Sequence, residues 1–161
     1  MVATKTAVGI SEVVVSNNPG ELLITYSLGS CLGVTAHDPV SMVGGLIHCM
    51  LPLSNVDGTK AREKPAMFVD SGIPLLFEAL YDLGAQKGRI ILKAAGCAQI
   101  MDPEGHFKIG ERNVTILRKL LWKNNILITS QSIGGNVART LSLDIGTGKT
   151  YVKIQGVEEE L

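Results

Sequence analysis

The stretch TYSLGSCLGVTAHDPVSMVGGLIHCML, residues 25–51, predicts two adjacent strands joined by a tight turn. Two β-rich runs flank Asp38-Pro39, and Asp and Pro are preferred at the first and second positions of a type I turn. A hairpin that turns directly after Pro39 places Cys31 opposite His48, with their Cβ atoms roughly 5 Å apart. Two-residue hairpins favour the primed turns, and the alternative, a bulge or a longer loop, shifts this register by a residue. The stretch therefore predicts a thiol and an imidazole that are close enough to interact.

Cys31 has the sequence context of a nucleophile. It follows Gly29-Ser30, a flexible pair at which the preceding strand breaks, and such a bend can expose a side chain and free backbone N–H groups. A thiol attacks as its thiolate, and a neighbouring imidazole promotes deprotonation. We therefore expect Cys31 to be a nucleophile and His48 its base. The alternatives are a cysteine buried as a small apolar residue and a structural histidine in an apolar strand.

The other two cysteines do not indicate a metal site. Cys49 points to the opposite face of its strand from His48 and is expected in the core, and Cys97 is expected to pack in the core or a loop. Structural zinc needs four ligands, usually as close Cys or His pairs, which this sequence lacks. It also lacks phosphate-loop and dinucleotide-binding motifs, so no metal and no cofactor are expected.

Length and charge fit a single globular domain. We expect one domain over residues 1–157 of the 161, followed by an acidic, frayed tail over 158–161. Fifteen basic and fifteen acidic residues give a net charge of zero, which argues against nucleic acid as a partner. No signal peptide and no apolar run long enough for a bilayer are found, so we expect no membrane insertion. Three cysteines without paired spacing fit a reducing cytoplasm.

The order of predicted elements indicates an α+β fold. Strands come in clusters rather than alternating with helices, which favours a β-sandwich or curled mixed sheet with two flanking helices. The polar segment 54–64 is expected to be a loop. Helices are predicted from about 71 to 83 and from about 110 to 123 by the spacing of their apolar residues. The eight predicted strands cover residues 7–16, 21–28, 32–37, 45–51, 89–95, 126–130, 139–145 and 150–155.

An ordered set of motifs extends over nearly the whole chain. The motifs are Thr25-x-x-Leu28-Gly29-Ser30-Cys31, Asp38-Pro39, His48-x-Met50-Leu51-Pro52, Ile109-Gly110-x-Arg112-Asn113, Gly134-Gly135-Asn136-x-x-Arg139 and Thr147-Gly148. The Leu-Gly-Ser-Cys motif alone is of modest specificity, but the ordered set resembles the CheD family of chemoreceptor glutamine deamidases.

The resemblance implies an enzyme that converts glutamine side chains of methyl-accepting chemotaxis receptors to glutamate. Some members of the family also hydrolyse glutamyl methyl esters. The family's Cys-His-Thr triad carries over to Cys31, His48 and Thr25, and its fold resembles the catalytic domain of deamidating bacterial toxins. CheC, a phosphatase that acts on the phosphorylated response regulator CheY, is the implied partner. Thr25 would lie about 20 Å from Cys31 in an extended chain, so a fold-back at residues 28–30 is expected.

Two departures from the family pattern lie near these motifs. Ala95 and Cys97 stand where glycine and alanine are expected, and Ser27 stands where a glycine can occur beside the nucleophile. None of the three is a triad position. The rival interpretation is a binding module without turnover, which docks on receptors or on a CheC-type phosphatase.

Overall fold

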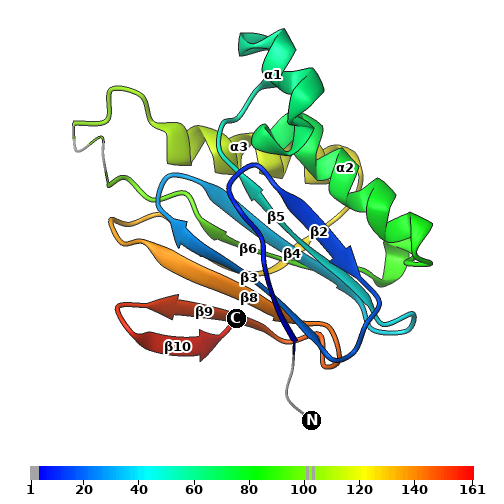
Figure 1. The fold of residues 1–161 in the computed structure, drawn as a ribbon. Helices are drawn as coiled ribbons and strands as arrows, with labels where there is room; N and C mark the ends of the chain where they lie inside the picture. The colour runs from blue at the N-terminus through cyan, green and yellow to red at the C-terminus, as the bar shows by residue number, and fades with distance from the viewer. Residues whose placement is uncertain (1–3, 101, 103) are drawn as a thin grey trace.

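The computed structural model describes residues 4–100, 102 and 104–161, and folds them into two stacked β-sheets with helices on one side (Figure 1). Sheet A consists, in spatial order, of β1 (Thr4–Ala7), β3 (Glu21–Leu28), β8 (Arg139–Asp144), β9 (Thr150–Ile154) and β10 (Val157–Glu160). Sheet B consists of β2 (Val13–Ser16), β5 (Val43–Cys49), β4 (Leu32–Asp38), β6 (Ile91–Gly96) and β7 (Ile128–Ile133).

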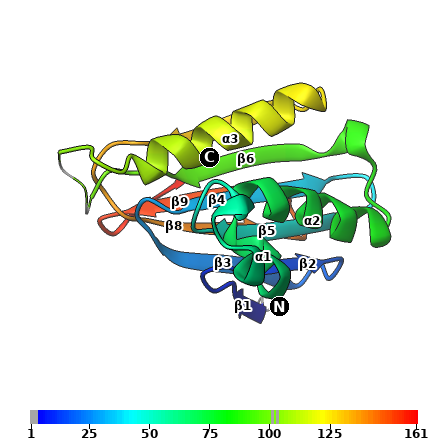
Figure 2. The same ribbon diagram turned by 90° about the horizontal axis from the view of Figure 1, so that it is seen from above.

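Three α-helices are found in the described residues: α1 (Gly58–Glu63), α2 (Val69–Asp82) and α3 (Ile109–Lys123). Helices α2 and α3 run over sheet B on the side away from sheet A (Figures 1 and 2). Short 3-10 turns cover Ser54–Val56, Pro65–Met67 and Lys87–Arg89. The predicted α+β class, with stacked sheets and flanking helices, is confirmed. No helix of the described residues is both long enough and apolar enough to cross a membrane.

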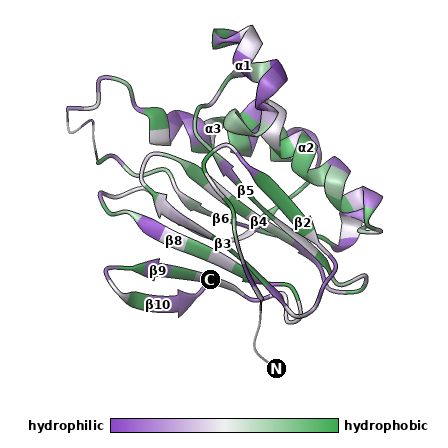
Figure 3. Ribbon diagram, in the orientation of Figure 1, coloured by the Kyte–Doolittle hydropathy of each residue, from purple (hydrophilic) through white to green (hydrophobic). Residues whose placement is uncertain are grey.

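The central strands of sheet B, β4 and β5, bury side chains on both of their faces, because each lies between two apolar layers. Leu32, Val34 and Ala36 of β4 join the layer between sheet B and the helices. Leu46 of β5 joins the layer between the two sheets. His48 lies two residues after Leu46, so strand alternation aims it into the same layer between the sheets. Figure 3 shows the contrast in hydropathy, with green interior strands and a purple β10.

The β4–β5 hairpin differs from its predicted register. Asp38 pairs with Val43, so the loop holds Pro39–Met42, and Gly33 rather than Cys31 lies opposite His48. The predicted direct opposition of Cys31 and His48 is therefore wrong. The longer loop is held by the Asp38 carboxylate, which accepts from the backbone N–H of Val40 at 2.9 Å. A shift of two residues keeps each side chain on the same face, so Cys31 becomes a diagonal neighbour of His48.

Two segments that were expected to lack regular structure form it. The segment 54–64 holds a 3-10 turn and helix α1, because the side chain of Asp57 caps the helix by accepting from the backbone N–H of Lys60 at 3.0 Å. The expected frayed tail is also wrong, since Val157–Glu160 forms β10 against β9. A two-residue turn at Gln155-Gly156, with φ of 50° and 82°, matches the geometry that closes a tight hairpin.

The N-terminal run, predicted as one strand over 7–16, is divided between the two sheets. Strand β1 pairs in parallel with β3 in sheet A, and β2 pairs with β5 in sheet B. The connection between them runs beside the end of β5. There the backbone N–H of Ser11 donates to the carbonyl of His48 at 2.8 Å, and the N–H of His48 donates to the carbonyl of Glu12 at 3.0 Å. This connection therefore fixes the backbone on both sides of the histidine.

Candidate active site

Thr25 and His48 meet between the two sheets. Thr25 lies on β3 of sheet A and His48 on β5 of sheet B, and the Thr25 Oγ1 atom is 2.7 Å from His48 Nδ1. Both residues are fully buried. The contact arises because the sheets stack face to face, so it crosses the sandwich rather than depending on a simple fold-back at residues 28–30.

The Thr25 hydroxyl determines which nitrogen of His48 carries the proton. Its Oγ1 is also 2.7 Å from the carbonyl oxygen of Val8, which can only accept. The single hydroxyl proton therefore goes to Val8, and Thr25 accepts from His48 Nδ1–H. The lone pair of the neutral imidazole is then on Nε2, which is buried and has no partner in the described part of the chain. His48 thus has a free basic nitrogen.

Cys31 lies at the bend by which the chain passes from sheet A into sheet B. It directly precedes β4, and its side chain is half-buried against the layer between the sheets. Gly33 faces His48, and Cys31 lies two residues earlier, just before the first paired residue of β4, so strand alternation puts it diagonally from His48 on the same face. The structure therefore brings Thr25 and His48 into contact and puts Cys31 on the face that His48 occupies.

Burial keeps the thiol and the imidazole neutral. Removal from water lowers the pKa of His48 to about 4. Burial likewise raises the pKa of the Cys31 thiol, and the backbone N–H of Cys31, which favours the thiolate, offsets this only in part. At neutral pH the pair is a thiol beside a neutral base. His48 can thus take the thiol proton during attack, whereas a preformed imidazolium–thiolate pair is disfavoured.

The bend before Cys31 is shaped by the backbone of β3 and held by β6. The β3–β8 pairing shifts between Thr25 and Leu28, and Ser27 within this bulge has a φ of 59°. That left-handed conformation explains why a glycine can occur at this position. The backbone N–H of Cys97 then donates to the carbonyl of Cys31 at 2.8 Å, and that of Ala98 to Gly29 at 2.9 Å. The bend is therefore anchored on the continuation of β6.

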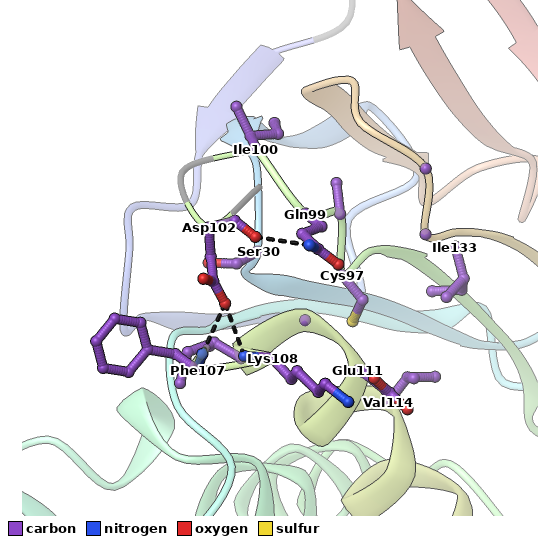
Figure 4. Close-up of a pocket in the computed structure, with 15 residues that line it drawn as sticks. Ser30, Cys97, Gln99, Ile100, Asp102, Phe107, Lys108, Glu111, Val114 and Ile133 are labelled. Atoms are coloured by element: carbon purple, nitrogen blue, oxygen red, sulfur yellow. Dashed lines mark hydrogen bonds between the residues drawn. The ribbon is translucent and has the colours of Figure 1, made fainter. Parts of the chain in front are cut away.

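A cavity of about 440 Å³ opens beside this bend, between the loop after β6 and the start of α3 (Figure 4). The carboxylate of Asp102 closes its loop by accepting from the backbone N–H groups of Phe107 at 2.7 Å and Lys108 at 2.9 Å. Its lining includes Ser30, Cys97, Ile100, Phe107, Val114 and Ile133. Cys97, expected in the core or a loop, is buried and lies at the wall of this cavity, whereas Cys49 is core on the helix side of sheet B.

Arg139 and Asn113 lie near the site without a role predicted for either. The buried guanidinium of Arg139 donates to Ser132 Oγ at 3.0 Å and to the carbonyl of Gly96 at 3.4 Å, and so joins the two sheets. The buried side chain of Asn113 reaches from α3 to the bend. The sequence signal for both is their place in the ordered motifs, since neither residue type suggests acyl chemistry by itself.

Comparison with known proteins identifies the family of the chain. Residues 50–154 match the family model described as CheD chemotactic sensory transduction. A probable chemoreceptor glutamine deamidase CheD 1 from Syntrophus aciditrophicus (strain SB) is 52% identical over 149 residues, which cover 92% of this chain and 93% of the relative. Similarly named proteins from Solibacter usitatus (strain Ellin6076) and Pyrococcus horikoshii are 44% and 40% identical, over 96% and 91% of this chain and 91% and 90% of the relatives. The chain belongs to the CheD family.

Proposed function

We propose that this protein hydrolyses the side-chain amide of specific glutamines on methyl-accepting chemotaxis receptors, giving glutamate and ammonia. Family membership and the names of the relatives support the reaction and its substrate. The observation that carries the mechanism is the 2.7 Å contact between Thr25 and His48, which leaves the Nε2 lone pair free on the face that Cys31 shares. In this proposal Cys31 is the nucleophile, His48 the base and Thr25 the residue that orients it.

The first half of the reaction is acyl transfer to sulfur. His48 Nε2 takes the proton from Cys31 Sγ as the sulfur attacks the glutamine carboxamide carbon. A C–S bond forms and the carbonyl oxygen becomes an oxyanion. When the tetrahedral intermediate collapses, the C–N bond breaks and His48 gives its proton to the leaving nitrogen. Ammonia departs and a thioester remains on Cys31.

The second half returns the enzyme to its starting state. His48, neutral again, takes a proton from water as the water oxygen attacks the thioester carbon. The C–S bond breaks, the thiolate leaves and recovers the proton from His48, and the product is glutamate. The net change is glutamine plus water to glutamate plus ammonia, with no cofactor. A glutamyl methyl ester would react by the same steps with methanol as the leaving group.

The oxyanion needs hydrogen-bond donors, and the backbone N–H of Cys31 is the first candidate. This N–H already favours negative charge on its own sulfur. Removing one such donor in acyl-transfer enzymes typically costs ~3 kcal/mol of transition-state stabilisation. The bend anchored on β6 would hold this peptide in a fixed orientation before the substrate binds.

The proposal is tested by mass spectrometry of receptor cytoplasmic fragments incubated with wild-type protein and two variants. We expect wild-type protein to convert specific glutamines to glutamates and Cys31→Ala to abolish the conversion. Cys49→Ala is the matched control, because it removes the thiol beside His48 that is buried on the helix side of sheet B. Conversion by Cys31→Ala at the wild-type rate, or binding of receptor fragments without any turnover by wild-type protein, would contradict the proposal.

We also propose, on the family resemblance alone, that the protein acts in the cytoplasm and binds a CheC-type phosphatase. Co-elution of the two purified proteins in size-exclusion chromatography tests this partner. Separate elution at micromolar concentrations, with an active deamidase in the same sample, would contradict the pairing and leave the deamidation reaction unaffected.

A further inference from the structure

One buried amide connects the two chain segments that carry the proposed nucleophile and base. Asn113 on α3 is fully buried, and its Nδ2 group donates to the carbonyl of Ser30 at 3.0 Å and to the carbonyl of Met50 at 3.3 Å. Ser30 directly precedes Cys31, and Met50 lies two residues after His48. Both protons of the amide group are therefore used to join the bend to the end of β5.

The orientation of this amide is fixed by its surroundings. If the group were flipped, its oxygen would face two carbonyl oxygens and neither could be satisfied. In the orientation found, Oδ1 is buried without a partner in the described residues. A buried acceptor without a partner lowers stability. The side chain thus keeps an unfavourable oxygen while it supplies two donors.

Holding the Ser30 carbonyl also sets the direction of the Cys31 N–H. A trans peptide is planar, and its C=O and N–H point in opposite directions. Because Asn113 draws the Ser30 carbonyl toward α3, the N–H of the same peptide points away from α3. Strand alternation aims the Cys31 side chain toward the layer between the sheets, which is also the side of sheet B away from α3. The N–H and the thiol are consequently presented to the same region.

We infer that Asn113 is a positioning residue: it orients the Ser30–Cys31 peptide so that the Cys31 N–H faces the developing oxyanion, and it ties that peptide to the strand of His48. The inference rests on the proposed role of Cys31 as the nucleophile. It adds that α3, which contributes no triad residue, sets the geometry of the reacting atoms through one side chain.

Two substitutions test the inference. Asn113→Asp keeps the shape of the side chain but replaces the donor with an oxygen, and Asn113→Leu removes both polar atoms. We expect each to lower kcat for receptor deamidation by at least tenfold with little change in KM. We also expect the pH at which Cys31 is half-alkylated by iodoacetamide to rise, because its N–H no longer supports the thiolate. A residue that only stabilised the fold would not move this titration.

The controls separate positioning from stability and from the proposed function. Leu121→Ala removes a buried side chain two turns further along α3 and should lower the melting temperature while the thiol titration stays in place. A folded Asn113→Asp or Asn113→Leu protein with wild-type kcat and an unchanged titration would overturn the inference. Cys31→Ala, assayed in parallel, distinguishes failure of the proposed function from failure of the inference. An active Cys31→Ala protein would show that the proposed nucleophile is wrong. An inactive Cys31→Ala protein beside a fully active Asn113 variant would show that only the positioning role is wrong.

Discussion

At the scale of single residues, the Thr25 hydroxyl has the clearest chemical consequence. Its proton goes to the carbonyl of Val8, so it can only accept from His48, and the imidazole is held as the Nδ1–H tautomer. A hydroxyl can therefore fill the place that a carboxylate holds in other triads, although it adds no negative charge beside the imidazole. The absence of that charge agrees with the lowered pKa of His48.

Two substitutions of Thr25 separate the effect of its hydroxyl on the rate from the effect of its side-chain volume. Thr25→Val keeps the shape but leaves His48 Nδ1–H buried without an acceptor, and we expect the deamidation rate to fall about 10²-fold. Thr25→Ser keeps the hydroxyl and should stay within about tenfold of wild type. Initial rates of ammonia release measure both variants. A near wild-type rate for Thr25→Val beside a larger loss for Thr25→Ser would show that packing, and not the hydrogen bond, is what Thr25 supplies.

The neutral thiol–imidazole pair gives a distinctive pH dependence. Since burial raises the pKa of Cys31 and lowers that of His48 to about 4, alkylation of Cys31 should keep increasing with pH beyond the ordinary thiol pKa of about 8.5. The measurement is the rate of iodoacetamide labelling at Cys31 between acid and alkaline pH. A rate that already reaches its plateau near neutral pH would reveal a preformed ion pair instead.

At the scale of secondary-structure elements, the sequence predicted most of the strands and both long helices. Strand β3 has the predicted bounds, and α3 begins one residue before its predicted start. These elements have strong apolar patterns. The register of the β4–β5 hairpin was off by two residues because the loop, closed by the carboxylate of Asp38, is longer than the assumed turn. The shift of two residues keeps Cys31 on the face that His48 occupies, but moves it from the directly opposite position to a diagonal one.

The α1 helix and β10 were missed for different reasons. Helix α1 is six residues long, too short for a periodic apolar pattern, and depends on a cap by Asp57. Strand β10 is acidic and exposed, so its composition suggested a tail. It forms because the Gln155-Gly156 turn directs the chain back along β9.

Gly33 lies opposite His48, and its substitution tests whether the close packing of the two sheets there requires a glycine. A Cβ atom at this position would lie 2.8 Å from the side chains of both Leu28 and Leu141. We expect Gly33→Ala to lower the free energy of unfolding by about 1–3 kcal/mol through overpacking. Gly88→Ala is the matched control, because a Cβ there meets nothing within 4 Å. Urea denaturation measures both, and equal effects would contradict the packing argument.

At the scale of the whole molecule, the candidate site is a product of the stacking of two sheets. Thr25 comes from sheet A and His48 from sheet B, and they meet because both side chains point into the layer between the sheets. No local pattern in the sequence specifies which strands of one sheet lie over which strands of the other. The role of Thr25 was therefore predicted only by family resemblance, and the contact itself required the tertiary structure.

Burial of His48 links the stability of the whole fold to pH. Its pKa is about 4 in the folded protein and near 6.5 in the unfolded chain, so the unfolded state binds the proton more tightly. The contribution of neutral His48 to the free energy of unfolding is therefore fully present above pH 6.5. That free energy falls by about 3 kcal/mol as the pH falls from 6.5 to 4. Urea melts across this range should show the loss.

The His48→Gln variant identifies the source of that pH dependence. It lacks the titrating group, so its free energy of unfolding should change much less between pH 6.5 and pH 4. The pKa of Asp38 is raised by burial, but hydrogen bonds from Arg89 and from backbone N–H groups more than reverse this and hold it far below the usual value of 3.8. Protonation of Asp38 therefore weakens the fold only at more acidic pH. The same slope in wild-type protein and His48→Gln would assign the effect to other groups.

Hydroxylamine trapping shows whether Cys31 forms a thioester with the receptor glutamine. Added during turnover, hydroxylamine competes with water for the thioester and converts the same glutamines to glutamyl hydroxamates, which mass spectrometry of the receptor fragment detects. We expect hydroxamate at the deamidated positions with wild-type protein, in a proportion that rises with hydroxylamine concentration, and none with Cys31→Ala. Conversion of glutamine to glutamate without any hydroxamate at high hydroxylamine concentration would rule out the thioester.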